Sequence, residues 1–447
     1  MRSQWLMILG VRTTDRCRMF EQTPTTSTQC VRESILFCLL LGFLPSPAFS
    51  AEQRQANLRG PLAELPSQPG EHLVKIKALK QGEWLELGPP KADPKWGRAR
   101  GRSWTAKMPL APKLRGAFLF GQGVHGYVKP DGHYMDDLWF YDINAHRWIC
   151  CYPGANTKSL QLTINKDGFE TTEDGEPIPV AAMGHGYEMT AYDTENQQFV
   201  FVPCGDPYWK KPLARREQWF KPGPKDASPW SFDSATGKWH RKRTGTPGPQ
   251  FGFGDTLEYL PARKDFFVAH RSNDVWFYNP QMNKWSRAEP KGPSPPFGID
   301  CTACYDVKRD RVYMGGGGYP TTPKGKNAFW IYDVQGNTWI NPQPKGAPCR
   351  GSTSYGTNNA LMLVDSTNDV VLLIFHSFNY TKKELLGIYV YDPDSNSWTD
   401  KALPIPEKLG DSRKAKNGFY DAALNAVFLH AAGDSRDDSE IWVFRFK

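Results

Sequence analysis

A pattern of ten residues that occurs five times constrains the fold of this chain more than any other feature. Each copy reads aromatic, any residue, Tyr or Phe, Asp or Asn, five further residues, Trp. A sixth, partial copy at residues 440–447 lacks the Trp. Such a repeat marks a structural unit that stacks on its neighbours, so it is identified before the fold. The full copies, each written with the two residues before it, are DLWFYDINAHRW (137–148), SPWSFDSATGKW (228–239), DVWFYNPQMNKW (274–285), AFWIYDVQGNTW (328–339) and GIYVYDPDSNSW (387–398).

Each copy is predicted to form two strands joined by a tight turn. Trp139 and Tyr141 share one face of an extended strand, and Phe140 gives the other face an apolar side chain as well. A strand that is apolar on both faces lies between two layers. The Asp or Asn begins the turn. Four residues later comes a residue type that tolerates positive φ, as a hairpin requires, so His146 is interpreted as a turn residue. These residues are His146, Gly237, Asn283, Asn337 and Asn396.

A second hairpin precedes most copies, which gives four antiparallel strands per repeat. The motif Trp residues stand 91, 46, 54 and 59 residues apart, as expected for propeller blades with inserts. With 40 Gly and 37 Pro residues and no long stretch of helical spacing, the chain favours short strands and turns. The upstream hairpins are 191–202, 304–318, 363–375 and 419–433.

The repeat resembles the kelch repeat, the blade motif of kelch proteins and of the central domain of galactose oxidase. The kelch double glycine is best kept at Gly315–Gly318, with relics at 121–123 and 204–205. The resemblance covers about residues 82–447. It implies an all-β fold, a β-propeller with four antiparallel strands per blade. Five full copies and one partial copy predict six blades, with seven as the alternative. The strand that the sixth blade lacks is expected near Trp84, so an N-terminal strand would pair with the C-terminal blade and close the ring.

The N-terminal region predicts export. An apolar run, Ile35–Leu44, is too short to span a bilayer and fits a secretory signal with Ala48–Ser50 as the cleavage site. The long segment ahead of it leaves open a start at Met19. The predicted organisation is an N-terminal extension and signal peptide (1–50), a linker (51–80) and the propeller (81–447). A secreted or periplasmic protein without a stable membrane span would permit disulfides, whose pairing the sequence leaves open. Six cysteines follow the signal: Cys150, Cys151, Cys204, Cys301, Cys304 and Cys349.

Two long inserts are the first candidate binding surface. By the topology of a four-stranded meander, Tyr152–Met183 and Gly205–Ser228 emerge on the same face around the second blade, and binding residues concentrate on such loops. The second insert interleaves aromatic and basic side chains, which suits an anionic glycan. The alternative is a cationic loop whose aromatic residues pack onto the blade. The candidate residues are Tyr208, Trp209, Lys211, Arg215, Arg216 and Trp219.

Polar residues at the ends of inner strands are the second candidate, a rim around the propeller axis. They include acids, histidines and cations that could grip a carboxylate or act as acid and base. No pair has a spacing that guarantees a metal site, so no metal and no cofactor are predicted. The rim residues are Arg102, His125, His185, Asp255, His270, Asp300, Arg350, His376, Lys416 and His430.

The sequence favours a binding module for a glycan or a protein over an enzyme. A net charge of +8 is mild for 447 residues and does not call for nucleic acid. The alternative is an enzyme that acts on a small acidic sugar at the central mouth, similar to the kelch-type sialic acid epimerases. In it Asp255, Asp300 or a histidine would be the acid or base, and Arg102 or Arg350 would hold the carboxylate. Copper oxidase activity, as in galactose oxidase, is not indicated, because its ligand set cannot be placed on these residues.

Overall fold

The structure is a computed structural model in which the chain divides into two units, Met1–Phe49 and Ser50–Lys447. Everything described below lies in the second unit. The predicted signal peptide therefore falls outside the described residues. These are 60–102, 105, 107–121, 135–155, 163–179, 188–203, 227–246, 248–249, 255–269, 274–295, 301–316, 329–346, 360–375, 386–410, 414–433 and 435–447.

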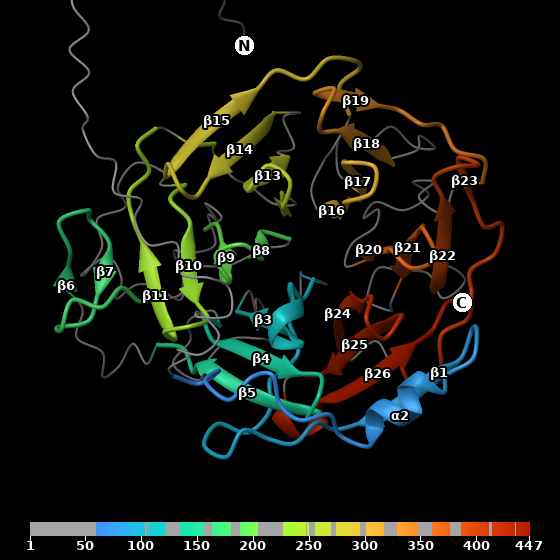
Figure 1. Cartoon of the computed structure of the whole chain (residues 1–447), viewed down its shortest axis with the longest axis horizontal. Helices are drawn as coiled ribbons and strands as arrows, with labels where there is room; N and C mark the ends of the chain where they lie inside the picture. Colours follow the sequence, from blue (N-terminus) through green and yellow to red (C-terminus); the bar gives the residue numbers. More distant parts are fainter. Residues whose placement is uncertain are drawn as a thin grey trace, which may run out of the picture. The chain divides into compact units, whose positions relative to one another are not determined.

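Six four-stranded antiparallel sheets follow one another around a ring (Figure 1), so the prediction of a six-bladed, all-β propeller is confirmed. Blade one contains β2 (Leu110–Ala111), β3 (Gly116–Phe120), β4 (Leu138–Asp142) and β5 (Arg147–Tyr152). Blade two contains β8 (Thr190–Asp193), β9 (Gln198–Phe201), β10 (Trp230–Asp233) and β11 (Lys238–Arg241). Blade three contains β12 (Thr256–Leu260), β13 (Asp265–Ala269), β14 (Val275–Asn279) and β15 (Lys284–Ala288).

The remaining blades repeat this order, and a small hairpin stands outside it. Blade four contains β16 (Cys301–Asp306), β17 (Arg311–Gly316), β18 (Trp330–Asp333) and β19 (Thr338–Ile340). Blade five contains β20 (Leu361–Asp365), β21 (Val370–Phe375), β22 (Gly387–Asp392) and β23 (Ser397–Trp398). Blade six contains β24 (Ala415–Asp421), β25 (Ala426–Ala432) and β26 (Glu440–Phe444), with β1 (Trp84–Gly88) as its outer strand. The hairpin is β6 (Thr163–Ile164) and β7 (Glu170–Thr171), and two 3-10 turns are η1 (Pro112–Leu114) and η4 (Arg436–Asp438).

The ring closes as predicted, because β1 pairs antiparallel with β26. Trp84 stands opposite Phe444, and their rings lie 4.8 Å apart. The outer strand of the last blade therefore comes from the N-terminal part of the chain. This pairing ties two segments that are far apart in sequence, and it covers the edge of β26 that would otherwise be open.

The repeated motif forms a hydrogen-bonded turn that also holds the preceding blade. In blade four the Tyr332 hydroxyl donates to Asn337 Oδ1 at 2.6 Å, and Asn337 has φ near +48°, as predicted for this position. Asn337 Nδ2 then donates to the Glu289 carbonyl at 3.0 Å, in the segment that follows blade three. Blades three and five repeat the Tyr–Asn bond. In blade one His146 takes the place of the Asn. Its φ is near +48° and its Nδ1 lies 2.8 Å from the Tyr141 hydroxyl, so it is a turn residue, as the sequence predicted.

The segment that leaves each of these blades runs along the outer strand of the next. Lys291, which follows β15, accepts a backbone hydrogen bond from Trp339 at 2.9 Å and donates one to the Asn337 carbonyl at 2.8 Å. Gly292 comes next with φ near +89°, and a Cβ there would lie 2.5 Å from the Trp339 carbonyl oxygen. Glycine at this position follows from both the left-handed backbone and the close approach.

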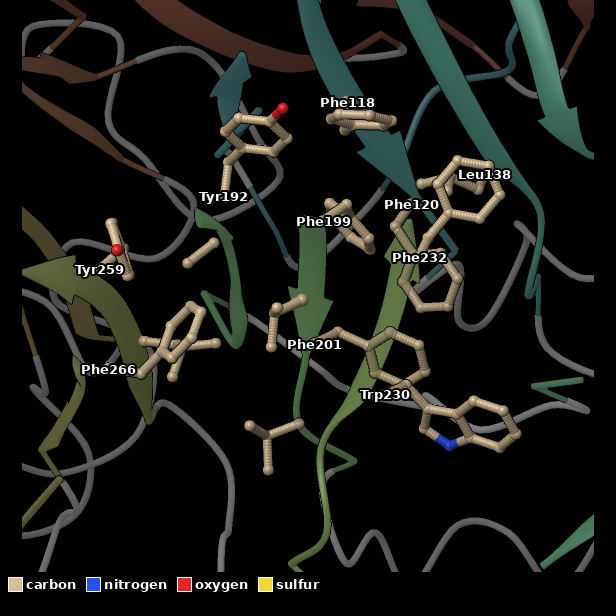
Figure 2. Packing of buried hydrophobic residues seen from close by; sticks show 14 of the residues in the cluster. Phe118, Phe120, Leu138, Tyr192, Phe199, Phe201, Trp230, Phe232, Tyr259 and Phe266 are labelled. Carbon is tan, nitrogen blue, oxygen red and sulfur yellow. The ribbon is translucent and has the colours of Figure 1, made fainter. Parts of the chain in front are cut away.

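Aromatic side chains fill the space between neighbouring blades. Figure 2 shows this packing for the first three blades, with Phe118 and Phe120 facing residues of blade two. Phe120 and Phe201 stack at 4.3 Å between centroids. Burying one such side chain stabilises the fold by about 1.5–3 kcal/mol, and a well-oriented ring pair adds about 0.5–1.5 kcal/mol. The core is therefore a series of seams between sheets.

Residues 60–80, here called the N-terminal belt, pack across the outside of several blades. The sequence placed them in a linker. Leu62 belongs to the core shared by blades one, two and three, and Ile76 in helix α2 (His72–Lys77) belongs to the core shared by blades one and six; both are fully buried. Ser67 donates to Asp142 Oδ2 at 2.5 Å in the motif turn of blade one. The belt is therefore packed on the propeller, which the sequence analysis did not predict.

Candidate functional site

Four of the ten predicted rim residues lie within the described part of the chain: Arg102, Asp255, Lys416 and His430. All four are buried, with at most 1% of the residue exposed. The other six rim residues and all six insert candidates lie outside the described residues, so the structure does not place them. They are His125, His185, His270, Asp300, Arg350, His376, Tyr208, Trp209, Lys211, Arg215, Arg216 and Trp219.

Two of the four described rim residues, Arg102 and His430, come together at the seam between blades six and one. Lys416 stands opposite Ala431, which belongs to the core shared by blades five and six. Asn417 on β24 stands opposite His430 on β25 and follows Lys416 directly. The Asn417 amide accepts from the Arg102 backbone N–H at 3.4 Å and donates to the Thr105 carbonyl at 2.7 Å. The segment that leads from β1 to β2 is thus fixed across the end of β24. Asp255 lies elsewhere, directly ahead of β12.

Arg102 forms a buried ion pair with Asp137 at the start of β4. Arg102 Nη2 lies 3.0 Å from Asp137 Oδ1, and the two side chains are 0% and 4% exposed. Asp137 also accepts a hydrogen bond from Trp139 Nε1 at 2.7 Å. Burial lowers the pKa of Arg102, and the charge of Asp137 opposes this. Arginine stays protonated in proteins, so Arg102 and Asp137 attract each other and stabilise the seam. Because both side chains are buried, the guanidinium is not available to a ligand in solvent.

His430 is held neutral in the same seam. Trp148 Nε1 donates to Ser439 Oγ at 3.2 Å, and His430 Nε2 lies 2.9 Å from the same oxygen. An indole N–H can only donate, so Ser439 Oγ accepts from Trp148. Burial, followed by the charges of Arg102 and Lys414, lowers the pKa of His430 to about 3. His430 is therefore a neutral, buried side chain that packs against Trp148 and Ser439.

The sequence reasoning missed a charged pair that lies across the propeller axis. Lys107 Nζ donates to Glu258 Oε1 at 2.6 Å and to the Leu257 carbonyl at 2.5 Å. The side chains of Lys107 and Glu258 are 14% and 11% exposed. Burial raises the pKa of Glu258, against the effect of Lys107. One signal was in the sequence, because Glu258 is a charged residue within an inner strand whose other members are Thr, Leu and Tyr.

The two long inserts are connected as predicted. The first leads from β5 to β8 and the second from β9 to β10, so each is anchored in blade two. In a meander of alternating strand direction both connections leave the same end of the blade. The β6–β7 hairpin of the first insert packs on the outer strand β11. There the Arg241 guanidinium lies 4.1 Å from the Phe169 ring centroid, and Arg243 Nη2 donates to the Asp167 carbonyl at 2.6 Å.

Within the ranges that the structure covers, no group of three or more His, Cys, Asp or Glu side chains is arranged to hold a metal ion. Cys151 and Cys304 are free thiols. Burial raises the pKa of Cys151 and of Cys304, so both are protonated. None of the helices in these ranges is long and apolar enough to cross a membrane.

No family profile and no curated protein matches this chain. The structure itself defines the class of protein, a six-bladed β-propeller closed by an N-terminal strand. The polar groups described above, two charge pairs and a neutral histidine, are buried and stabilise the ring. The rim and the insert as binding sites stay predictions.

Proposed function

We propose that this chain is an exported kelch-type propeller that binds an anionic glycan through the face that carries the two inserts. The observation that carries the proposal is the position of the connections β5–β8 and β9–β10, both anchored in blade two. A rigid blade can hold two long loops side by side, and such loops usually contain binding residues. The chain's own residues supply the chemistry, since the second insert combines Trp209 with Arg215 and Arg216.

The anchoring of the first insert supports a preformed surface. Phe169 is 2% exposed, and the guanidinium groups of Arg241 and Arg243 lie over its ring at 4.1 and 5.4 Å. Cation–π contacts of this kind each contribute about 0.5–2 kcal/mol. A hairpin fixed in this way loses less conformational entropy when a ligand binds beside it.

The kelch assignment within this proposal rests on sequence and register together. Gly315 and Gly316 of the glycine run end strand β17 opposite Thr302 and Cys301 of β16. Kelch repeats have a double glycine at the end of this second strand. The export assignment rests on the signal-like segment Ile35–Leu44.

The test is a glycan array probed with the protein that begins at Ala51, beside two variants, Trp209→Ala and Arg215→Ala. The expected result is a preference for sulfated or uronic acid glycans that falls at least tenfold in both variants and weakens with salt. Lys264→Ala is the matched control. Lys264 lies in the β12–β13 turn of blade three, on the face opposite to the inserts, and its side chain is 49% exposed. No preference for acidic glycans would refute the glycan assignment, and equal binding by all variants would refute the second insert as the binding surface.

An enzyme that acts on a small acidic sugar is the second candidate. What favours it is Glu258, an acid near the axis whose pKa burial raises, because such groups are common in active sites. The test is to follow N-acylated acidic sugars with the protein by proton NMR, with Glu258→Gln as the variant. Turnover by the protein that disappears in the variant supports catalysis, and unchanged sugars exclude it for these substrates.

A further inference from the structure

The side chain of Lys107 crosses the centre of the ring. Its backbone bridges to Gly418 on β24 of blade six and precedes β2 of blade one. Its amino group binds Glu258 and the Leu257 carbonyl on β12 of blade three. In a ring of six, blade three lies opposite blade six (Figure 1). One side chain therefore joins inner strands that no sheet and no shared core brings together.

This contact is largely withdrawn from water. The two side chains are 14% and 11% exposed, and charges attract more strongly in such surroundings than at the surface. Removing these charges from water is also unfavourable, and for this reason burial raises the pKa of Glu258. When Glu258 is protonated, the Lys107 ammonium loses its counter-charge and keeps the Leu257 carbonyl as its hydrogen-bond acceptor.

Four further titratable groups stand on segments next to β12 or directly ahead of it. The Cys304 thiol is protonated and carries no charge, and a carboxylate in this position makes the ionised form of Glu258 less favourable. Lys107 opposes this through its charge and its hydrogen bond. The groups are Cys304 and Asp306 on β16, Glu188 ahead of β8, whose carbonyl accepts from Leu257, and Asp255 ahead of β12.

We propose that Lys107 and Glu258 form a clasp across the propeller axis, closed while Glu258 is ionised and released when Glu258 takes up a proton. This goes beyond the proposed function, because it concerns the axis and needs no ligand. Release frees Lys107 from β12 and leaves a positive charge near the axis. The sheets and the seams between blades remain in place, so the opening is local.

Hydrogen exchange measured by mass spectrometry tests the clasp in the whole protein. The peptides to follow contain residues 107–111 and 255–260, and their rates are corrected for the intrinsic effect of pH. Between about pH 7.5 and the ordinary glutamate value of 4.5, exchange in both peptides should rise about tenfold, the factor for losing one charge-assisted hydrogen bond. Peptides from β20–β22 should change little.

Two variants separate the clasp from general acid sensitivity. Glu258→Gln mimics the protonated acid, so it should exchange at neutral pH as the original protein does in acid, with no further response to pH. Lys107→Met should also exchange faster at neutral pH, because it removes the clasp, but it keeps the titrating Glu258 and so does not test the pH response. Glu195→Gln is the matched control, because the Lys264–Glu195 pair joins blades two and three at the surface, with side chains 49% and 52% exposed. It should leave both peptides unchanged.

Two outcomes would overturn the proposal. One is exchange of the original protein in both peptides that stays constant over the pH range, which needs no variant to be seen. The other is a pH response that persists in Glu258→Gln, since that response would belong to another group. Neither outcome depends on whether a glycan binds the inserts.

Discussion

Replacing Gly292 by alanine tests how the segment between blades is held. Gly292 has φ near +89°, and its Cβ would stand 2.5 Å from the Trp339 carbonyl oxygen. An L-residue in this left-handed region costs about 1–2 kcal/mol. The close approach must also be relieved by moving the segment, which weakens the Lys291–Trp339 and Lys291–Asn337 backbone bonds of 2.9 and 2.8 Å. At about 1 kcal/mol each, the total loss is about 2–4 kcal/mol.

Two control variants separate the effect of the close Cβ contact from the effect of the left-handed backbone conformation. Gly175 has φ near +79° with no heavy atom within 4 Å of the position that an alanine methyl group would take, so Gly175→Ala should cost only the backbone term of about 1 kcal/mol. Gly346 has φ near +67° and a Cβ position 3.0 Å from the Trp398 carbonyl oxygen. Its alanine variant should fall between the other two.

The assay is thermal and urea unfolding of the three variants beside the original protein. A loss of 2–4 kcal/mol lowers Tm by about 2–5 °C in a unit of this size, from the usual entropy of unfolding per residue. The comparison of variants does not require reversible two-state unfolding, because all share one scan rate. If Gly292→Ala is no less stable than Gly175→Ala, the argument from close approach is wrong.

Three further variants test other contacts. His146→Asn introduces the residue that three other copies have at this position. Burial lowers the pKa of His146 from 6.5 to about 4, so the original protein loses stability as the pH falls from 6.5 to 4. The variant should have the same stability at pH 7 and lose less of it over this range, measured by urea unfolding. Arg309→Met breaks an ion pair with Asp369 in the next blade, whose pKa that arginine lowers; the loss of stability should be present above the ordinary aspartate pKa of 3.8 and shrink in acid, and a constant difference would contradict it. Arg102→Met leaves Asp137 buried without its counter-charge and should lower stability by about 3–5 kcal/mol in the same assay, whereas the exposed Arg287→Met should change it by less than about 1 kcal/mol.

Much of the propeller could be predicted because its information is local. A motif such as residues 328–339 specifies strand, turn and strand through alternating apolar residues, an Asp and a residue with positive φ. Repetition of this unit predicts stacked sheets, and the incomplete last copy predicts a missing strand. The pairing of Trp84 with Phe444 followed from that count.

The candidate site was harder to predict because strand position does not determine burial. Arg102 and His430 fall at strand ends, where the sequence suggested a solvent-facing rim. In the structure the segment ahead of β2 covers the seam of blades six and one, and both residues become interior. A linear pattern does not contain the path of a connecting segment over a neighbouring blade, so it could not distinguish a rim from a seam.

The sequence by itself determined the class of fold and the turn residues, because each is set by spacing within one repeat. It also determined the number of blades and the closing strand, because these follow from the number of repeats and from the incomplete last copy. Only the tertiary structure decided which charges meet. Lys107 and Glu258 are 151 residues apart, and they lie together because six blades bring opposite inner strands within the length of one lysine side chain. The position of the N-terminal belt is decided in the same way, since Leu62 and Ile76 pack into apolar seams that exist only once neighbouring blades lie against each other.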